Sequence, residues 1–274
     1  MKKLLILLSI ITLVSCEEVI NVDLTTSEPK LVIDASINWA KGTSGNVQTI
    51  KLSTTTGYYQ REIPKVSGAT VYITNSSNVT FNFIEETIPV NNTGKYTCSN
   101  FIPLIGETYL LTVIYNGETY TAEEKLLQAP DITNIEQQND LGLNNDQIGL
   151  KTNFNDISNQ DNFYLLRYET NVTPFPEYQI LGDKFNQNSN MVGLYTNEKL
   201  IAGSEFSCSL YGITKRYYNY MTLLIGASSG GNSGPFQVPP TKVRGNITNI
   251  TNPNSNPLGY FRLSETVSLN YTVQ

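Results

Sequence analysis

Residues 108–123 have the sequence TYLLTVIYNGETYTAE, in which two runs of β-forming residues flank the pair Asn116-Gly117. Asn-Gly favours the type I′ turn, because both central residues of that turn need a positive φ. On either side, Thr108–Tyr115 and Glu118–Glu123 alternate between the two faces expected of a half-buried strand. This stretch therefore predicts a β-hairpin, and it sets the fold class expected of the neighbouring chain.

Five segments upstream of the hairpin have the same short, β-forming character. They are Leu31–Asn38, Val47–Thr55, Ala69–Asn75, Val79–Glu85 and Gly94–Cys98. Short strands at a spacing of roughly 10 residues are typical of a β-sandwich, and a helical period of useful length is absent from this part of the sequence. We expect a β-sandwich over residues 31–128.

A second β-domain is expected from residue 131 to residue 274. Pro130 cannot donate to a sheet ladder and biases the residue before it towards extended geometry, which suits a short linker. The strands predicted beyond it are Ile132–Gln137, Gly149–Asn155, Phe163–Asn171, Phe206–Thr214, Lys242–Ile250, Tyr260–Leu263 and Thr266–Val273.

One stretch of the second domain favours a helix, near residues 215–226. Thr214 can cap its N-terminus, and Gly226 with the Ser/Gly-rich run at 228–235 ends it. The helical spacing places Tyr217, Tyr220, Met221 and Leu224 on one face. A strand is the alternative, because three of the four residues at 217–220 are tyrosines. The expected contact region combines this segment with the loop after it: Tyr217, Tyr218, Tyr220 and Asn232.

The N-terminus predicts a lipoprotein signal peptide over residues 1–15. Lys2 and Lys3 precede an apolar run at 4–14, which has the length of a signal-peptide core and is too short to span a bilayer. The run ends in Leu13-Val14-Ser15-Cys16, which resembles a bacterial lipobox. A plain secretory signal with a chance cysteine, or a buried N-terminal strand, are the alternatives. On the lipoprotein interpretation, Cys16 is acylated and binds the membrane.

Residues 16–30 then form a lipidated tether. Glu17 and Glu18 directly follow the cysteine and resemble the acidic export tags of lipoproteins that reach the cell surface. Cleavage removes two lysines, so the mature chain has 16 basic and 24 acidic residues and a formal charge of −8, against −6 for the full chain. An acidic chain of this kind is a poor nucleic-acid ligand, because a phosphate backbone needs clustered Lys and Arg.

The composition excludes several kinds of catalytic site. The sequence contains no histidine, so it holds no Ser-His-Asp triad, no Cys-His pair and no HExxH zinc motif. Asp156 and Asp161 flank a polar loop and are the carboxylate pair considered for a hydrolase, although solvated strand ends are the ordinary explanation of such residues. The Asn-rich stretch 139–146 lacks the order of ligands that a calcium loop needs. We expect no cofactor and no metal.

The two cysteines that remain after Cys16 are expected to be separate thiols. Cys98 and Cys208 alternate with apolar residues on strand faces that look buried, and they fall in different predicted domains. Buried thiols behave as small hydrophobic groups. A disulfide between them is the alternative that an oxidising compartment would permit.

Short motifs across the mature chain carry a family resemblance: residues 16–18, 31–35, 66–71, 94–96, 109–113, 117–122, 239–247 and 258–261. This resemblance is to a Bacteroidetes family of outer-membrane lipoproteins of unknown function, often encoded beside TonB-dependent receptors. It implies an immunoglobulin-like or carboxypeptidase-regulatory-like sandwich followed by a second β-sandwich-like domain with a helical insertion. Gly68, Gly94 and Gly245 in these motifs are expected to serve backbone turns.

The predicted anchor, the β-domains and the absence of catalytic motifs, taken with this resemblance, predict a non-enzymatic protein at the outer membrane that assists a TonB-dependent transporter by capturing a ligand or by forming a lid or scaffold. Such a protein is lipid-anchored and can face the cell exterior. The alternative is a cell-surface adhesin or envelope scaffold without a transporter partner. No catalytic residue is carried over from the family.

Overall fold

The computed structural model describes residues 28–57, 59–87, 92–141, 147–158, 160–184, 189–228 and 243–274. Cys16 and Asn232, and with them the predicted signal peptide, tether start and Ser/Gly-rich loop, lie outside these residues. The predicted mainly β, sandwich-like class is confirmed, since strands dominate the described chain and one helix lies beside them. In that described part, no helix is both long and apolar enough to cross a lipid bilayer.

In the described residues, seven strands precede residue 128, and all seven were predicted. They are β1 (Leu31–Ala40), β2 (Gln48–Thr54), β3 (Thr70–Asn75), β4 (Thr80–Glu85), β5 (Lys95–Cys98), β6 (Thr108–Tyr115) and β7 (Glu118–Lys125). The β6–β7 hairpin turns at Asn116 and Gly117 with φ of 49° and 77°, as a type I′ turn requires.

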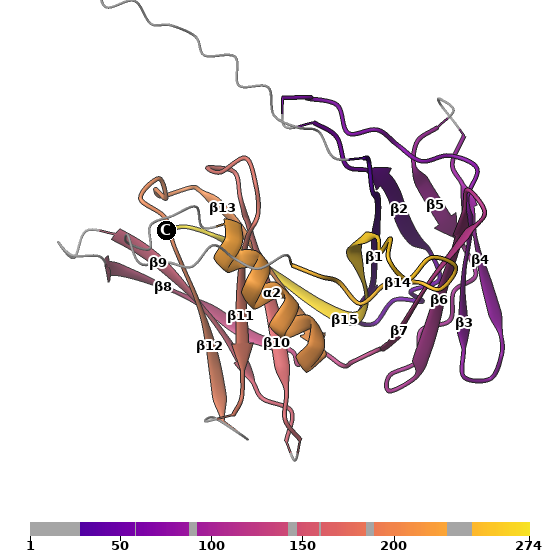
Figure 1. The fold of residues 1–274 in the computed structure, drawn as a ribbon. Helices are drawn as coiled ribbons and strands as arrows, with labels where there is room; N and C mark the ends of the chain where they lie inside the picture. Colours follow the sequence, from indigo (N-terminus) through magenta and orange to yellow (C-terminus); the bar gives the residue numbers. More distant parts are fainter. Residues whose placement is uncertain are drawn as a thin grey trace, which may run out of the picture.

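These strands form what we call the N-terminal sandwich. One layer contains β1, β2 and β5, the other β3, β6 and β7, and β4 pairs with both β5 and β3 where the layers meet (Figure 1). Alternation along β1 sends Ile33, Ala35 and Ile37 into the core between the layers and leaves the intervening residues on the outer face.

The following elements form the C-terminal sandwich and its helix. They are β8 (Ile132–Leu141), β9 (Gln147–Asn155), β10 (Phe163–Thr170), β11 (Glu177–Gly182), β12 (Asn190–Thr196), β13 (Glu205–Ile213) and α2 (Lys215–Ser228). The three-stranded sheet β12-β9-β8 packs on one face of β10, β11 and β13, and α2 covers the other face (Figure 1). The sequence analysis missed β11 and β12.

The predicted helix is confirmed, and the strand alternative for residues 215–226 is wrong. The side chain of Thr214 caps the helix, since its Oγ1 accepts from the backbone N–H of Tyr217 at 3.3 Å. Tyr217 and Met221 are the buried residues of its inner face. Arg216, in the first turn, forms an ion pair with Glu124 of β7 at 3.3 Å and so ties the helix to the N-terminal sandwich.

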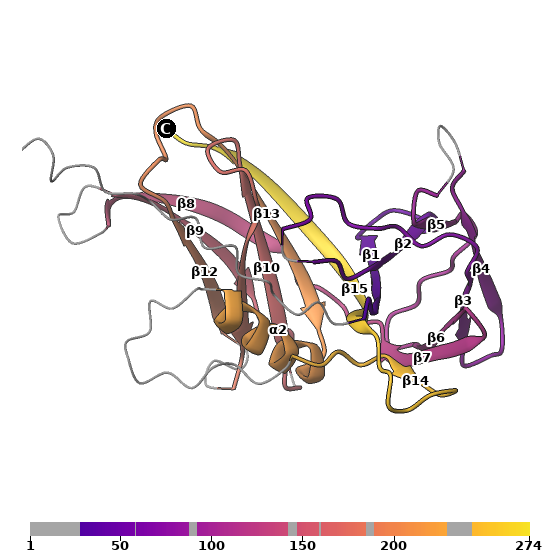
Figure 2. The ribbon, with the colours of Figure 1, turned by 45° about the horizontal axis from the view of Figure 1, so that its top comes forward.

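The C-terminal segment joins the two sandwiches. A single strand, β15 (Leu258–Thr272), replaces the two predicted at Tyr260–Leu263 and Thr266–Val273. Figure 2 shows it running from one sandwich to the other. Residues 258–266 pair with β1 in parallel, and residues 266–272 pair with β13 in the antiparallel sense.

The polar pair at the middle of β15, Ser264 and Glu265, does not interrupt the strand because both residues are buried and bonded. Glu265 accepts from the backbone N–H of Ala129 at 3.0 Å, which also fixes the predicted linker. The strand predicted at Lys242–Ile250 is wrong in its described residues except at β14 (Thr248–Asn249), which pairs with β7. The pairings of β14 and β15 therefore connect strands on the two sides of residues 128–131. The division into separate domains at these residues stays a prediction.

Close backbone contact explains why glycine occurs where this segment enters the N-terminal sandwich. A Cβ on Gly259 would lie 2.0 Å from the carbonyl oxygen of Ile33, and a Cβ on Gly245 would lie 1.7 Å from that of Gly259. Positive φ values confirm the backbone turns predicted at Gly68 and Gly94, whereas Gly245 serves this close approach instead.

Candidate functional site

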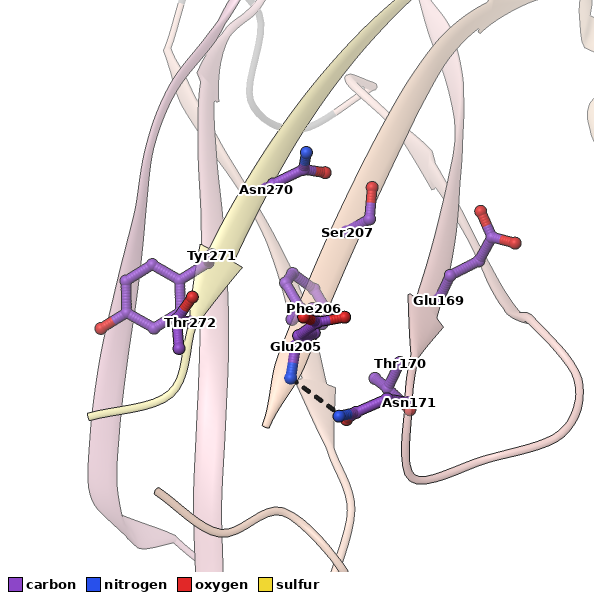
Figure 3. A pocket seen from close by; sticks show the side chains of 9 residues that line it. All are labelled: Glu169, Thr170, Asn171, Glu205, Phe206, Ser207, Asn270, Tyr271 and Thr272. Carbon is purple, nitrogen blue, oxygen red and sulfur yellow. Dashed lines mark hydrogen bonds between the residues drawn. The ribbon is translucent and has the colours of Figure 1, made fainter. Parts of the chain in front are cut away.

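Several hollows of the described surface, with volumes of about 360 to 660 Å³, are large enough to hold a small molecule. The first, of about 480 Å³, lies at the ends of β10, β13 and β15 (Figure 3). Glu169, Ser207 and Asn270 are cross-strand neighbours there and project on the same side of the sheet. The carboxylate of Glu169 is already bound by Arg167. This hollow is a polar trough on the sheet surface, without a buried polar group directed at a ligand.

The second hollow, which we call the junction pocket, has a volume of about 660 Å³ and lies between the two sandwiches. One wall is polar and comes from the outer face of β1 and β2: Asp34, Ser36, Asn38 and Lys51. The opposite wall is apolar and aromatic and comes from β10, β11, β13 and α2: Leu165, Tyr178, Tyr211, Tyr217, Met221 and Leu224. Its position between structural units and its mixed lining are typical of ligand pockets.

Arg262 of β15 is the buried polar group of the junction pocket. It is 5% exposed. Its Nη1 donates to the hydroxyl of Ser264 at 2.7 Å, and its Nη2 donates to Oδ1 of Asn38 at 2.6 Å. The guanidinium carbon lies 4.9 Å from the ring centre of Tyr211 and 5.3 Å from that of Tyr217. Its Nε has no hydrogen-bond partner among the described residues.

The other charges of the pocket have compensating neighbours. Lys51 of β2 is the direct cross-strand partner of Asp34, whose Oδ1 also accepts from the Ser36 hydroxyl at 2.9 Å. Arg167 is held by both oxygens of Glu169, one of them at 2.7 Å from Nη2. Among the described ion pairs, none includes Arg262. Arg262 is therefore a buried cation of the pocket without an ion-pair partner among the described residues.

A family model described as a domain of unknown function (DUF4249) matches residues 17–269. The chain belongs to this family. No curated protein matches it.

Two solved structures illustrate what this DUF4249 chain is similar to. One is a segment of two fibronectin type-III domains from chicken tenascin, with 10% identity, 67% of this chain and 90% of that chain covered, and a TM-score of 0.22. The other comprises domains FN1–FN3 of chicken CNTN1, with 11% identity, coverages of 66% and 62%, and a TM-score of 0.25.

The tyrosines predicted as a contact region occupy different places in the DUF4249 chain. Tyr217 lines the junction pocket and packs edge-on against Tyr260 at 4.8 Å between ring centres. Tyr220 packs against Tyr260 at 4.7 Å, and Tyr218 packs against Phe163 at 5.0 Å. Burial raises the pKa of Tyr217, while the charge of Arg262 acts in the opposite direction. The helix thus brings one of the three tyrosines to the pocket.

Arg262 is the functional candidate that the sequence analysis missed. A signal was present, because the run Tyr260-Phe261-Arg262-Leu263 places an arginine within an otherwise apolar, strand-forming stretch. The aromatic residues that stack on it come from β13 and α2 and cannot be paired with it from sequence spacing.

The remaining sequence candidates have structural partners. Asp156 accepts from the hydroxyl of Tyr164 at 2.7 Å and from the side-chain amide of Asn162 at 3.1 Å, which fixes the loop between β9 and β10. The described residues contain no group of three or more acidic or cysteine side chains placed to hold a metal ion. Cys98 and Cys208 are separate buried thiols, as expected.

Proposed function

We propose that this DUF4249 chain is a non-enzymatic outer-membrane lipoprotein, anchored through acylated Cys16, that captures a ligand as accessory to a TonB-dependent transporter. The observation that carries the capture role is the junction pocket, with one polar wall, one aromatic wall and the buried Arg262 between them. The anchor is supported by the charged start, the apolar run and the lipobox that ends in Cys16. Glu17 and Glu18 support a position on the cell surface.

The chemistry of the pocket favours binding over catalysis. Arginine stays protonated at any physiological pH, so Arg262 can hold an anion but cannot shuttle a proton. Burial raises the pKa of the Tyr217 hydroxyl, which keeps that group neutral as well. With no histidine in the sequence, imidazole cannot supply the missing acid or base. Arg262 and Tyr217 are therefore suited to recognising a ligand.

The anchor is tested by labelling cells with a fatty-acid analogue. The wild-type chain and a Cys98→Ser variant should both carry the label, because Cys98 is buried in the N-terminal sandwich. Cys16→Ser should abolish labelling and release the chain from the membrane fraction. Label retained in Cys16→Ser would refute the anchor.

The transporter role is tested by affinity purification from outer membrane solubilised in a neutral detergent. The tagged wild-type chain should recover a TonB-dependent barrel protein, and an unrelated lipoprotein with the same tag should not. Recovery of no barrel protein would contradict the accessory role and would favour an adhesin or scaffold.

A further inference from the structure

Arg262 carries a buried charge that takes part in none of the described ion pairs. A cation removed from water is costly unless it is paired. Here the side chain is 5% exposed, and its described partners are a hydroxyl, an amide oxygen and two tyrosine rings, all of them neutral. Cation–π contacts offset part of the cost. A negative charge supplied by a ligand would offset the remainder.

The hydrogen-bonding groups of Arg262 restrict the shape of that ligand. A guanidinium has five N–H donors in a planar fork. One hydrogen on Nη1 is donated to Ser264 and one on Nη2 to Asn38, while the Nε–H has no partner among the described residues. A carboxylate can accept from two neighbouring N–H groups of a guanidinium together, in the bidentate geometry that arginine prefers.

The charge balance restricts the ligand to a monoanion. Asp34 faces Lys51 across the β1–β2 pair, and Glu169 holds Arg167, so one positive charge remains. A dianion such as phosphate would bring a second negative charge close to Asp34. The polar wall also offers the hydroxyl of Ser36, whereas Leu165, Tyr211 and Met221 opposite offer apolar surface.

We propose that the junction pocket binds a small organic acid, with its single carboxylate on Arg262 and an apolar or aromatic body against the tyrosine and α2 wall. A volume of about 660 Å³ is sufficient for a molecule of this kind. The inference rests on the proposed capture function and names its ligand class. A purely structural role of Arg262, as a clamp between the sandwiches, is the competing explanation.

The test is calorimetric titration of the lipidated full chain in a neutral detergent. The probes are hexanoate, 4-phenylbutyrate and indole-3-acetate, each paired with its neutral amide, together with inorganic phosphate. A short peptide with a free C-terminus, paired with its amidated form, distinguishes a peptide carboxylate from a free organic acid. At least one free acid should bind about tenfold or more tightly than its amide and than phosphate, because a charge-assisted hydrogen bond is lost in the amide.

Variants separate the ligand site from a clamp. Arg262→Lys keeps the charge and loses the fork, and it should weaken acid binding about tenfold or more. Ser36→Phe fills the pocket from the polar wall without changing Arg262, and it should also abolish binding. Arg61→Lys, the same change at an exposed arginine, should leave binding unchanged. Ser36→Phe keeps the test informative if Arg262→Lys fails to fold.

Three results would overturn the proposal. In the first, no acid binds more tightly than its amide. In the second, the peptide with a free carboxylate is the only probe that binds. In the third, acid binding survives both Arg262→Lys and Ser36→Phe. These failures are distinct from failure of the accessory role. A recovered barrel protein without acid binding removes the carboxylate site alone, whereas acid binding without a barrel protein removes the transporter role alone.

Discussion

Replacing Phe261 by alanine should destabilise both sandwiches together, although Phe261 belongs to the core of the N-terminal sandwich. It lies on β15, is 0% exposed and packs in the cluster that contains Ile33 and Leu111. Because β15 continues from β1 to β13 as one strand, opening of one sandwich removes an edge partner from the other. Phe154 is also 0% exposed and packs in the core of the C-terminal sandwich, so Phe154→Ala is the matched variant.

The expected magnitude follows from the buried area. A fully buried aromatic ring removes about 150–250 Å² from water, worth roughly 4–6 kcal/mol at about 25 cal/mol per Å². Alanine retains part of this area, so each variant should lose about 3–5 kcal/mol of unfolding free energy, as Phe-to-Ala changes in cores do. A loss of this size raises the unfolded population roughly 100-fold or more, at about 1.4 kcal/mol per factor of ten.

Two buried thiols report on the two sandwiches separately. In a chain that carries Cys16→Ser, only Cys98 and Cys208 remain to react. Labelling in moderate urea, followed by mass spectrometry of the two peptides, measures how often each sandwich opens. Phe261→Ala and Phe154→Ala should each accelerate labelling of both thiols by a similar factor. The reasoning is refuted if Phe261→Ala accelerates Cys98 alone and Phe154→Ala accelerates Cys208 alone.

Three further predictions concern stability measured by urea titration. Burial raises the pKa of the Cys208 thiol from 9.0 to about 12 and that of the Tyr109 hydroxyl from 10.0 to about 12, so the unfolded chain releases these protons first. The two buried groups stabilise the fold fully below pH 9, and the free energy of unfolding should fall between pH 9 and pH 12. An unfolding free energy that does not change over this pH range would contradict the burial of the two groups. Arg216→Met should lower the free energy of unfolding by about 1 kcal/mol, a modest loss because the side chain of Arg216 is 56% exposed beside buried Glu124. A loss as small as that of Arg61→Met would argue against the ion pair. Gly117→Ala should lower the free energy of unfolding by about 1–2 kcal/mol, because Gly117 has a φ of 77° that alanine adopts only with strain. An unchanged free energy of unfolding would disprove the type I′ turn.

Local signals in the sequence predicted the elements whose geometry is set by neighbouring residues. The Asn116-Gly117 turn and the alternation around it gave the hairpin, and Thr214 with the spacing of Tyr217 and Met221 gave the helix. These features depend on φ preferences and periodicities that act within a few residues. They needed no information about distant partners.

Features that depend on distant partners could not be predicted in the same way. Ser264 and Glu265 suggested a break in a strand, yet the backbone N–H of Ala129 donates to Glu265 across the fold. β11 lacks a clear apolar alternation, since every one of its residues is exposed or partly exposed. β12 does alternate between buried and exposed positions, but its exposed Val192 and Leu194 are apolar as well, so the alternation does not show in the sequence. The junction pocket depends on β1, β13 and α2 meeting at Arg262.

The central claim is that this chain captures a ligand at the outer surface of the cell. Protease treatment of intact cells tests that position most directly, with a periplasmic protein as the internal control. The anchored chain should be degraded while the control stays intact. A chain that resists protease until the outer membrane is permeabilised would contradict a position on the cell surface.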